Sequence, residues 1–164
     1  MRDSLPSARR DFLASVAAGG VAAALTLSGS AKALGIASLR LSNADWRKRL
    51  SPAAFAVLRE AATERPFSSP LNHEHRRGVF ACAGCALPLY LSATKFDSGT
   101  GWPSFYDHLP RAIETRADTS IGMARTEVRC ARCEGHLGHV FPDGPPPTSL
   151  RYCMNGVALQ FRPA

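Results

Sequence analysis

The chain has 164 residues, of which 45% are hydrophobic and 20% are charged. This composition is typical of a folded globular protein and excludes an intrinsically disordered one, and the length suits one domain with a modest core. The net charge is +7, but no basic run is interleaved with aromatic side chains, and we interpret Arg47-Lys48-Arg49 as a solvated helix face. A nucleic-acid partner is therefore not expected.

The beginning of the chain resembles a twin-arginine export signal. The pair Arg9-Arg10 precedes a Phe-Leu pair, an uncharged stretch rich in Ala and Gly follows over residues 13–27, and Ala31-Lys32-Ala33 offers a small-x-small cleavage site. We therefore predict a cleaved signal peptide over residues 1–33, a mature domain over residues 34–164, and export to the periplasm.

The alternatives for this first segment are a short membrane anchor and a disordered leader. A helix that spans a bilayer needs roughly 20 apolar residues. The uncharged stretch is shorter and rich in Gly, so we expect no stable membrane anchor after cleavage. Cleavage would remove four basic and two acidic residues and lower the net charge from +7 to +5.

Two short helical segments are predicted at the start of the mature domain. Residues 45–50 form a helical turn, and Ser51-Pro52 is a typical helix start, with Ser as N-cap and Pro at the first helical position. The helix should end by Arg65, because Pro66 disfavours helical backbone at the preceding residue. Apolar residues recur in this segment at helical spacing, at Ala54, Phe55, Leu58, Ala61 and Ala62.

The rest of the chain contains short β-like runs separated by Gly and Pro. The predicted strands cover residues 78–82, 87–91, 112–116, 123–130, 150–155 and 157–162. The run 123–130 alternates, with Arg125, Glu127 and Arg129 on one face and Thr126 and Val128 on the other. We therefore predict a mainly antiparallel β fold with a helix packed against it.

Four of the five cysteines form two CxxC pairs, Cys82/Cys85 and Cys130/Cys133. Each pair can supply two thiolates from one tight turn, so the two pairs predict a tetrahedral zinc site with no open position for a catalytic water. One alternative is two disulfides without metal. Another uses Cys130 and Cys133 with His136 and His139, which would leave the first pair without a role.

The fifth cysteine, Cys153, lies in a predicted strand, where the period of two places it on one face with Arg151 and Asn155. A nearby positive charge favours the thiolate, which is the nucleophilic form. The alternative is a buried core cysteine, which is common for a lone thiol, but a neighbouring Arg and Asn count against it.

Two further segments contain candidate site residues. His136 and His139 lie in a Gly-containing segment that we interpret as a loop; a neutral histidine can donate or accept a proton near pH 7, and Asp143 could orient an imidazole or an arginine. Trp102 and Phe105 lie on a loop rich in Gly and Pro. These rings could belong to the core, or they could receive a methyl thioether group.

Together these residues resemble the B-type methionine-R-sulfoxide reductases, over residues 50–161. The resemblance implies two antiparallel β-sheets with small helices and one structural zinc ion. It also implies an oxidoreductase that acts on a sulfur group and reduces methionine-R-sulfoxide in proteins and peptides. The motifs that carry it follow one another in order: Thr63-Glu64-Arg65-Pro66-Phe67, the pair beginning at Cys82, Lys95-Phe96-Asp97-Ser98-Gly99, Gly101-Trp102-Pro103-Ser104-Phe105, His136 through Pro145, and Arg151-Tyr152-Cys153.

The resemblance also implies a role for each matching residue. Cys153 is the nucleophile that attacks the sulfoxide sulfur and becomes a sulfenic acid, and His136 and His139 protonate the departing oxygen. The remaining matches shape the site around the thiolate (Asp143, Arg151, Asn155) or form the aromatic wall for the substrate (Trp102, with Phe105 nearby).

Thr100 stands where many members of that family have a resolving cysteine. With four cysteines assigned to zinc, we expect the sulfenic acid to be reduced by an external thiol such as a thioredoxin-like protein. Two other hypotheses remain: a zinc-ribbon binding module without catalysis, and a redox sensor in which the CxxC thiols themselves react. A monomer is the default expectation.

Overall fold

The structure is a computed structural model that describes residues 36–120 and 122–164. The predicted signal peptide over residues 1–33 lies outside the described residues. Within the described ranges, no helix combines the length and the apolar character needed to cross a bilayer.

Two short helices precede the strands, and each follows an N-cap serine. α1 spans Asn43–Arg49, and α2 spans Pro52–Glu60. At the start of α2 the hydroxyl of Ser51 accepts a hydrogen bond from the amide of Ala54, so the predicted helix start is confirmed. α2 ends at Ala61, which has left-handed backbone with a φ of 54°, before the limit set by the proline.

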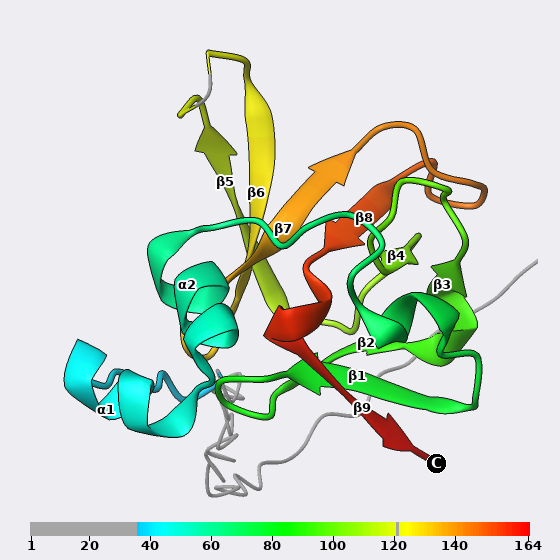
Figure 1. Cartoon of the computed structure of the whole chain (residues 1–164). Helices are drawn as coiled ribbons and strands as arrows, with labels where there is room; N and C mark the ends of the chain where they lie inside the picture. The colour runs from blue at the N-terminus through cyan, green and yellow to red at the C-terminus, as the bar shows by residue number, and fades with distance from the viewer. Residues whose placement is uncertain (1–35, 121) are drawn as a thin grey trace, which may run out of the picture. The chain divides into compact units, whose positions relative to one another are not determined.

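The strands of the described residues form two sheets in which every pairing is antiparallel (Figure 1). The three-stranded sheet has the order β2-β1-β9, formed by Pro88–Leu91, Gly78–Cys82 and Leu159–Pro163. The six-stranded sheet has the order β3-β4-β8-β7-β6-β5, formed by Lys95–Phe96, Ser104–Phe105, Arg151–Met154, His136–Phe141, Arg125–Cys130 and Ile113–Asp118. Short 3-10 turns lie at Pro70–His73, Ser92–Thr94 and Gly156–Ala158.

The predicted mainly β fold with two antiparallel sheets and small helices is confirmed, and three local predictions need correction. Phe105, predicted on a loop, lies with Ser104 in the short strand β4. The segment with His136 and His139 is not a loop but the strand β7, which lies inside the six-stranded sheet between β8 and β6. The last predicted strand begins later than expected, because residues 156–158 form a 3-10 turn before β9.

An aromatic cluster joins the two sheets. Phe80 of β1, Tyr90 of β2 and Phe105 of β4 are all completely buried. The rings of Tyr90 and Phe105 stack with centroids 4.4 Å apart, and Phe80 meets Phe105 edge-on at 4.9 Å. Phe105, which the sequence placed with the substrate wall, therefore lies in the core. Since successive side chains of a strand point to opposite faces, its neighbour Ser104 faces the other side.

β7 contains a β-bulge that decides how its side chains point. Along β6, Val128 pairs with Gly138 while the next residue, Arg129, pairs with His136, so Leu137 is the extra residue. In a regular strand, residues three apart point to opposite faces. One extra residue restores a common face, and His136 and His139 consequently lie beside each other, with ring centroids 5.3 Å apart.

Candidate active site and metal centre

The four paired cysteines come together as the sequence predicts. Cys82 and Cys85 lie at the turn between β1 and β2, Cys130 and Cys133 lie at the turn between β6 and β7, and the four sulfur atoms are all within 4.8 Å of one another. Sulfur atoms bound at about 2.3 Å to one tetrahedral zinc ion lie about 3.8 Å apart. The closest pairs, Cys82–Cys133 at 3.6 Å and Cys85–Cys130 at 3.5 Å, fit that geometry.

The alternatives for these cysteines do not agree with the structure. Sulfur separations of 3.5 and 3.6 Å are far longer than a disulfide bond, and all four cysteines are free and buried. His136 and His139 hydrogen bond to carboxylates instead of joining the sulfur cluster. The site fits one zinc ion and connects the two sheets.

A row of paired residues crosses the six-stranded sheet and contains Cys153. From β5 to β4, the partners in register are Arg116, Glu127, His139, Cys153 and Ser104. Directly opposed residues in an antiparallel sheet point to the same face. The thiol of Cys153 is therefore flanked by an imidazole on one side and a hydroxyl on the other.

Cys153 lines an open cavity of about 130 Å³. Cys153 is only half-buried, whereas the four cysteines of the metal centre are buried. This partial exposure also distinguishes Cys153 from a core cysteine. The other residues that line the cavity are Thr63, Trp102, Arg125, Gly138, His139, Phe141 and Asn155. Thus Trp102, His139 and Asn155 lie where the sequence predicts them, beside the candidate nucleophile.

Glu64 holds two walls of this cavity in place. Its backbone carbonyl accepts a hydrogen bond from the indole N–H of Trp102 at 3.2 Å, and its backbone amide donates to the side-chain oxygen of Asn155 at 2.9 Å. The amide nitrogen of Asn155 in turn donates to the carbonyl of Leu137 at 3.1 Å. Since both ends of the Asn155 amide are bonded, its orientation is fixed.

The pKa of the Cys153 thiol is raised by burial, which outweighs the opposing effects of Thr100, Arg151 and Ser104. The proximity of Arg151 therefore limits the rise in pKa but does not make the resting thiol unusually acidic. Arg151 is itself fixed by Asp143, with guanidinium-to-carboxylate distances of 2.9 and 2.7 Å, and this pairing lowers the pKa of Asp143. The guanidinium also lies 4.5 Å from the centre of the Phe141 ring.

A chain of three hydroxyl groups, from the loop before β4 and from β4 itself, reaches Cys153 through Thr100. Thr100 lies 3.8 Å from the sulfur and 2.8 Å from the hydroxyl of Ser98, which in turn lies 2.7 Å from that of Ser104. The sequence identified Thr100 only as the residue at the usual position of a resolving cysteine. In the structure it is a hydrogen-bond partner of the candidate nucleophile.

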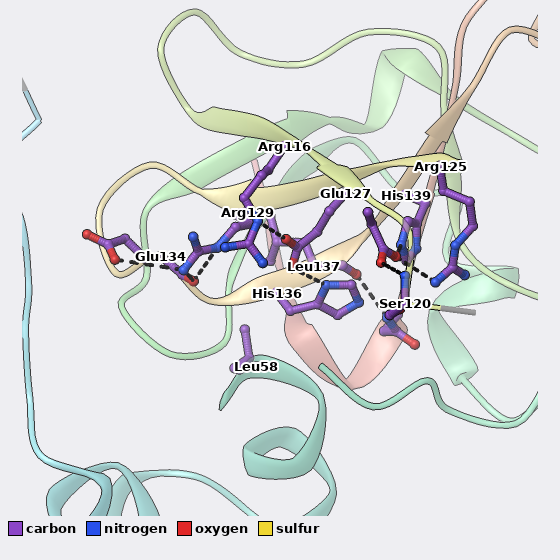
Figure 2. A network of polar contacts seen from close by, with 12 residues as sticks. Leu58, Arg116, Ser120, Arg125, Glu127, Arg129, Glu134, His136, Leu137 and His139 are labelled. Carbon is purple, nitrogen blue, oxygen red and sulfur yellow. Dashed lines mark hydrogen bonds and ion pairs between the residues drawn. The ribbon is translucent and has the colours of Figure 1, made fainter. Parts of the chain in front are cut away.

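Each of the two histidines is bonded to an acid (Figure 2). A ring nitrogen of His136, Nδ1, lies 2.8 Å from Glu127, while Nε2 of His139 lies 2.7 Å from Asp118. His136 is 5% exposed, and burial lowers its pKa despite the adjacent carboxylate. It does not line the cavity of Cys153 but a neighbouring one of about 150 Å³, in which His139 also takes part. Of the two predicted histidines, only His139 thus lines the cavity of the thiol.

The sequence did not single out the acids at this site. Glu127 and Arg125 share a face of the alternating run 123–130, which is a weak signal, since one face of an alternating strand must be polar in most sheets. Asp118 lies beyond the predicted strand 112–116 and left no signal. Their relation to the histidines depends on strand register, which only the folded structure supplies.

The chain is similar to known proteins over most of its length. Residues 50–163 match the family model described as the SelR domain. A protein of Agrobacterium fabrum is 54% identical over 123 residues, which cover 74% of this chain and 91% of that protein. One from Pseudomonas entomophila is 60% identical over 121 residues, covering 73% and 92%, and one from Bradyrhizobium diazoefficiens is 57% identical over 123 residues, covering 74% and 88%. All three are named peptide methionine sulfoxide reductase MsrB.

Proposed function

The chain belongs to the SelR domain family, and we propose on that premise that it reduces the R epimer of methionine sulfoxide in proteins and peptides to methionine. Such an enzyme is an oxidoreductase that acts on a sulfur group, a peptide-methionine (R)-S-oxide reductase. The observation that carries the proposal is the half-buried thiol of Cys153 in a cavity with Trp102, His139 and Asn155.

Cys153 is the nucleophile in this mechanism. Its thiolate attacks the sulfoxide sulfur, the sulfur–oxygen bond of the substrate breaks, and the oxygen is transferred to Sγ with uptake of one proton. The products are methionine and the sulfenic acid of Cys153. The substrate sulfur is reduced by two electrons and the cysteine sulfur is oxidised by two, so the step is balanced.

Proton delivery to the sulfoxide oxygen falls to the histidines, and His139 has the shorter route because it pairs with Cys153 across the sheet and lines the same cavity. His136 acts from the neighbouring cavity, through His139 or through water. Trp102 offers an aromatic face to the sulfur and methyl group of the substrate, which such rings bind well. Arg151, held by Asp143, stabilises the thiolate, and the fixed amide of Asn155 limits how the substrate lies.

The sulfenic acid must be reduced by a thiol from outside the chain. Cys153 is the fifth of five cysteines, and the other four form the metal centre. An external thiol attacks the sulfenic sulfur and releases water, and a second thiolate resolves the mixed disulfide and restores Cys153. A thioredoxin-like protein with two cysteines would supply both thiols.

The zinc ion has a structural role in this proposal. Cys82, Cys85, Cys130 and Cys133 would hold it as four thiolates, which fills a tetrahedral site. Bound there, the ion would fasten the β1–β2 turn to the β6–β7 turn, and β7 continues from the second turn to His136 and His139. A stable metal centre therefore helps to fix the strand that delivers the proton.

We also propose that the protein is exported to the periplasm by the twin-arginine route. The support is the sequence alone: Arg9-Arg10, the uncharged stretch 13–27 and the small residues 31–33. Replacement of both arginines by lysine should retain the protein in the cytoplasm with its first residues uncleaved. Periplasmic, processed protein from that variant would contradict this route.

Activity is tested with the purified, zinc-loaded protein on a peptide that carries separated R and S methionine sulfoxide, with dithiothreitol as reductant. We expect turnover of the R epimer alone and no turnover by Cys153→Ser, which should keep its fold and zinc. A folded, zinc-loaded protein without turnover would contradict the proposal and favour a zinc-dependent binding module. A response to oxidant that depended on Cys82 and not on Cys153 would instead favour a redox sensor.

A further inference from the structure

We propose that Asp118 and Glu127 are positioning residues that fix the two active-site histidines in opposite tautomers, so that Nδ1 of His139 and Nε2 of His136 are the ring nitrogens left to act in the reaction. This inference rests on the proposed reductase function and deepens it. Two parallel chains of contacts carry it, each running from an arginine through a carboxylate to a histidine (Figure 2).

The first chain runs from Arg125 through Asp118 to His139. The Oδ2 atom of Asp118 is 2.6 Å from the guanidinium of Arg125 and 2.7 Å from Nε2 of His139, while Oδ1 accepts a hydrogen bond from the amide of Ser120 at 2.9 Å. The bonds from Ser120 and His139 lower the pKa of Asp118, so its carboxyl is ionised at neutral pH.

An ionised carboxylate can only accept hydrogen bonds, so Nε2 of His139 must carry a hydrogen. The other ring nitrogen, Nδ1, is not bonded to Asp118, and the ring lines the cavity of Cys153. With both nitrogens protonated, His139 keeps its bond to Asp118 and offers the Nδ1 hydrogen to the sulfoxide oxygen.

The second chain runs from Arg116 through Glu127 to His136. Oε1 of Glu127 is 2.8 Å from Nδ1 of His136, and Oε2 is 3.3 Å from Nε of Arg116. Burial lowers the pKa of His136, which favours a neutral ring with its one hydrogen on Nδ1. Nε2 therefore bears the lone pair, the reverse of the tautomer in the first chain.

Nε2 of His136 is buried and has no hydrogen-bond partner within the described part of the chain. An unpaired polar atom is costly to bury, and His136 is only 5% exposed. We therefore infer that a bound molecule supplies the missing hydrogen bond to Nε2. A lone pair on Nε2 accepts a hydrogen bond from water in the neighbouring cavity or from the protonated oxygen. Glu127 thus leaves Nε2 of His136 as a hydrogen-bond acceptor, whereas Asp118 leaves Nδ1 of His139 as the atom that takes up the proton and delivers it.

The bulge in β7 explains why two acids are needed. Glu127 pairs in register with His139, yet its carboxylate bonds to His136, because the extra residue brings both rings to one face. His139 is then left for the acid of the outer strand β5. The charged or titratable groups that face His139 within the described residues are Asp118 of β5, Arg125 and Glu127 of β6, His136 of β7 and Cys153 of β8.

The tautomers can be read directly in the intact, zinc-loaded protein. Nitrogen-15 NMR of the five histidines, assigned with His136→Gln and His139→Gln, shows which ring nitrogen bears hydrogen. We expect hydrogen on Nδ1 of His136 and, in the neutral form of His139, on Nε2. The same tautomer in both rings would overturn the proposal whether or not the protein is a reductase.

Asp118→Asn tests the functional half of the proposal. Loss of the charge should lower kcat at least about 10-fold, since general acid catalysis itself contributes about 100- to 10,000-fold. KM should change little, and Asp118→Glu should restore part of the rate. Glu60→Gln, which removes one exposed carboxylate paired with Arg47, is the control with unchanged kcat.

Alkylation of Cys153 by iodoacetamide separates a positioning role from a loss of fold. We expect Asp118→Asn to alkylate at the wild-type rate and melt within a few degrees of the wild type. Wild-type turnover together with an unchanged kcat in Asp118→Asn would overturn the inference alone. No turnover by the wild type would instead count against the proposed function.

Discussion

Cys153 and His139 are direct partners across β8 and β7, which places the candidate nucleophile and the candidate proton donor side by side on one face of the sheet. Directly paired residues in an antiparallel sheet have Cβ atoms about 5 Å apart, and both side chains line one cavity. A substrate sulfur next to Sγ therefore has its oxygen within reach of the imidazole.

Replacement of His139 should separate thiol chemistry from sulfoxide reduction. We expect His139→Gln to lower kcat for the R epimer by about 100-fold or more, while alkylation of Cys153 by iodoacetamide stays within a few-fold of the wild type. Rapid-quench measurement of methionine formed in the first turnover isolates the step. Equal losses in reduction and alkylation would mean that the ring acts on the thiol and not on the oxygen.

The raised pKa of Cys153 gives the alkylation rate a defined pH dependence. Burial disfavours the thiolate, so at pH 7 the fraction ionised is smaller than in a free cysteine with a pKa of about 8.5. The rate should rise with pH and reach half its maximum above that value. Arg151→Met removes an effect that lowers the pKa, so its curve should shift further to alkaline pH. A shift to lower pH would contradict the assigned role of the arginine.

Elements that depend on nearby residues could be predicted from the sequence. The start of α2 follows from Ser51 and Pro52, which satisfy the helix N-terminus by themselves. The metal centre follows from two CxxC spacings, because each spacing specifies a tight turn that presents two sulfurs. Cys153 could be identified because it was the one thiol that this site left over.

The catalytic strand could not be predicted in the same way. The Gly-containing segment with His136 and His139 has the composition of a loop. A bulge in β7 also breaks the period of two that would otherwise indicate a strand. The acids Asp118 and Glu127 reach the histidines only through the register of three strands. Such register is a property of the assembled sheet, and no local pattern in this sequence encodes it.

Loss of the metal should destabilise the protein without altering the thiol chemistry of Cys153 directly. Cys130→Ser leaves three ligands and loosens the contact between the two sheets, and we expect a loss of about 3 kcal/mol or more, which corresponds to roughly 10 °C in Tm for a domain of this size. Calorimetry with metal analysis provides the measurement. Cys153→Ser is the matched control and should keep one zinc ion per chain and a Tm near the wild type.

Thr100→Cys should convert the protein to one that resolves its own sulfenic acid. The threonine hydroxyl lies 3.8 Å from the sulfur of Cys153, so a thiol at this position can attack the sulfenic sulfur with loss of water. After one turnover without reductant, mass spectrometry should find a disulfide between positions 100 and 153, where the wild type retains a single reactive sulfenic acid. A sulfenic acid that persisted in the variant would show that the loop holds position 100 in an unsuitable orientation.

Trp102 and Phe105 lie three residues apart but should respond to replacement in different ways. Trp102 lines the cavity of Cys153 and anchors its indole N–H on Glu64, so Trp102→Ala should raise KM for the peptide substrate about 10-fold or more with a smaller loss of stability. Phe105 is completely buried against Tyr90 and Phe80. Phe105→Ala should cost about 3–5 kcal/mol of unfolding free energy.

Denaturant unfolding and steady-state kinetics on both variants, at a temperature where each is folded, distinguish the two roles. Phe105→Leu is the milder companion, since it keeps most of the buried volume and should retain a near-normal KM. If Phe105→Leu instead raised KM as strongly as Trp102→Ala while remaining stable, Phe105 itself would have to be included in the substrate site. Successive side chains of a strand point to opposite faces, so Ser104 and Phe105 should lie on different sides of β4. That result would contradict the assignment of Phe105 to the core and of Trp102 to the cavity.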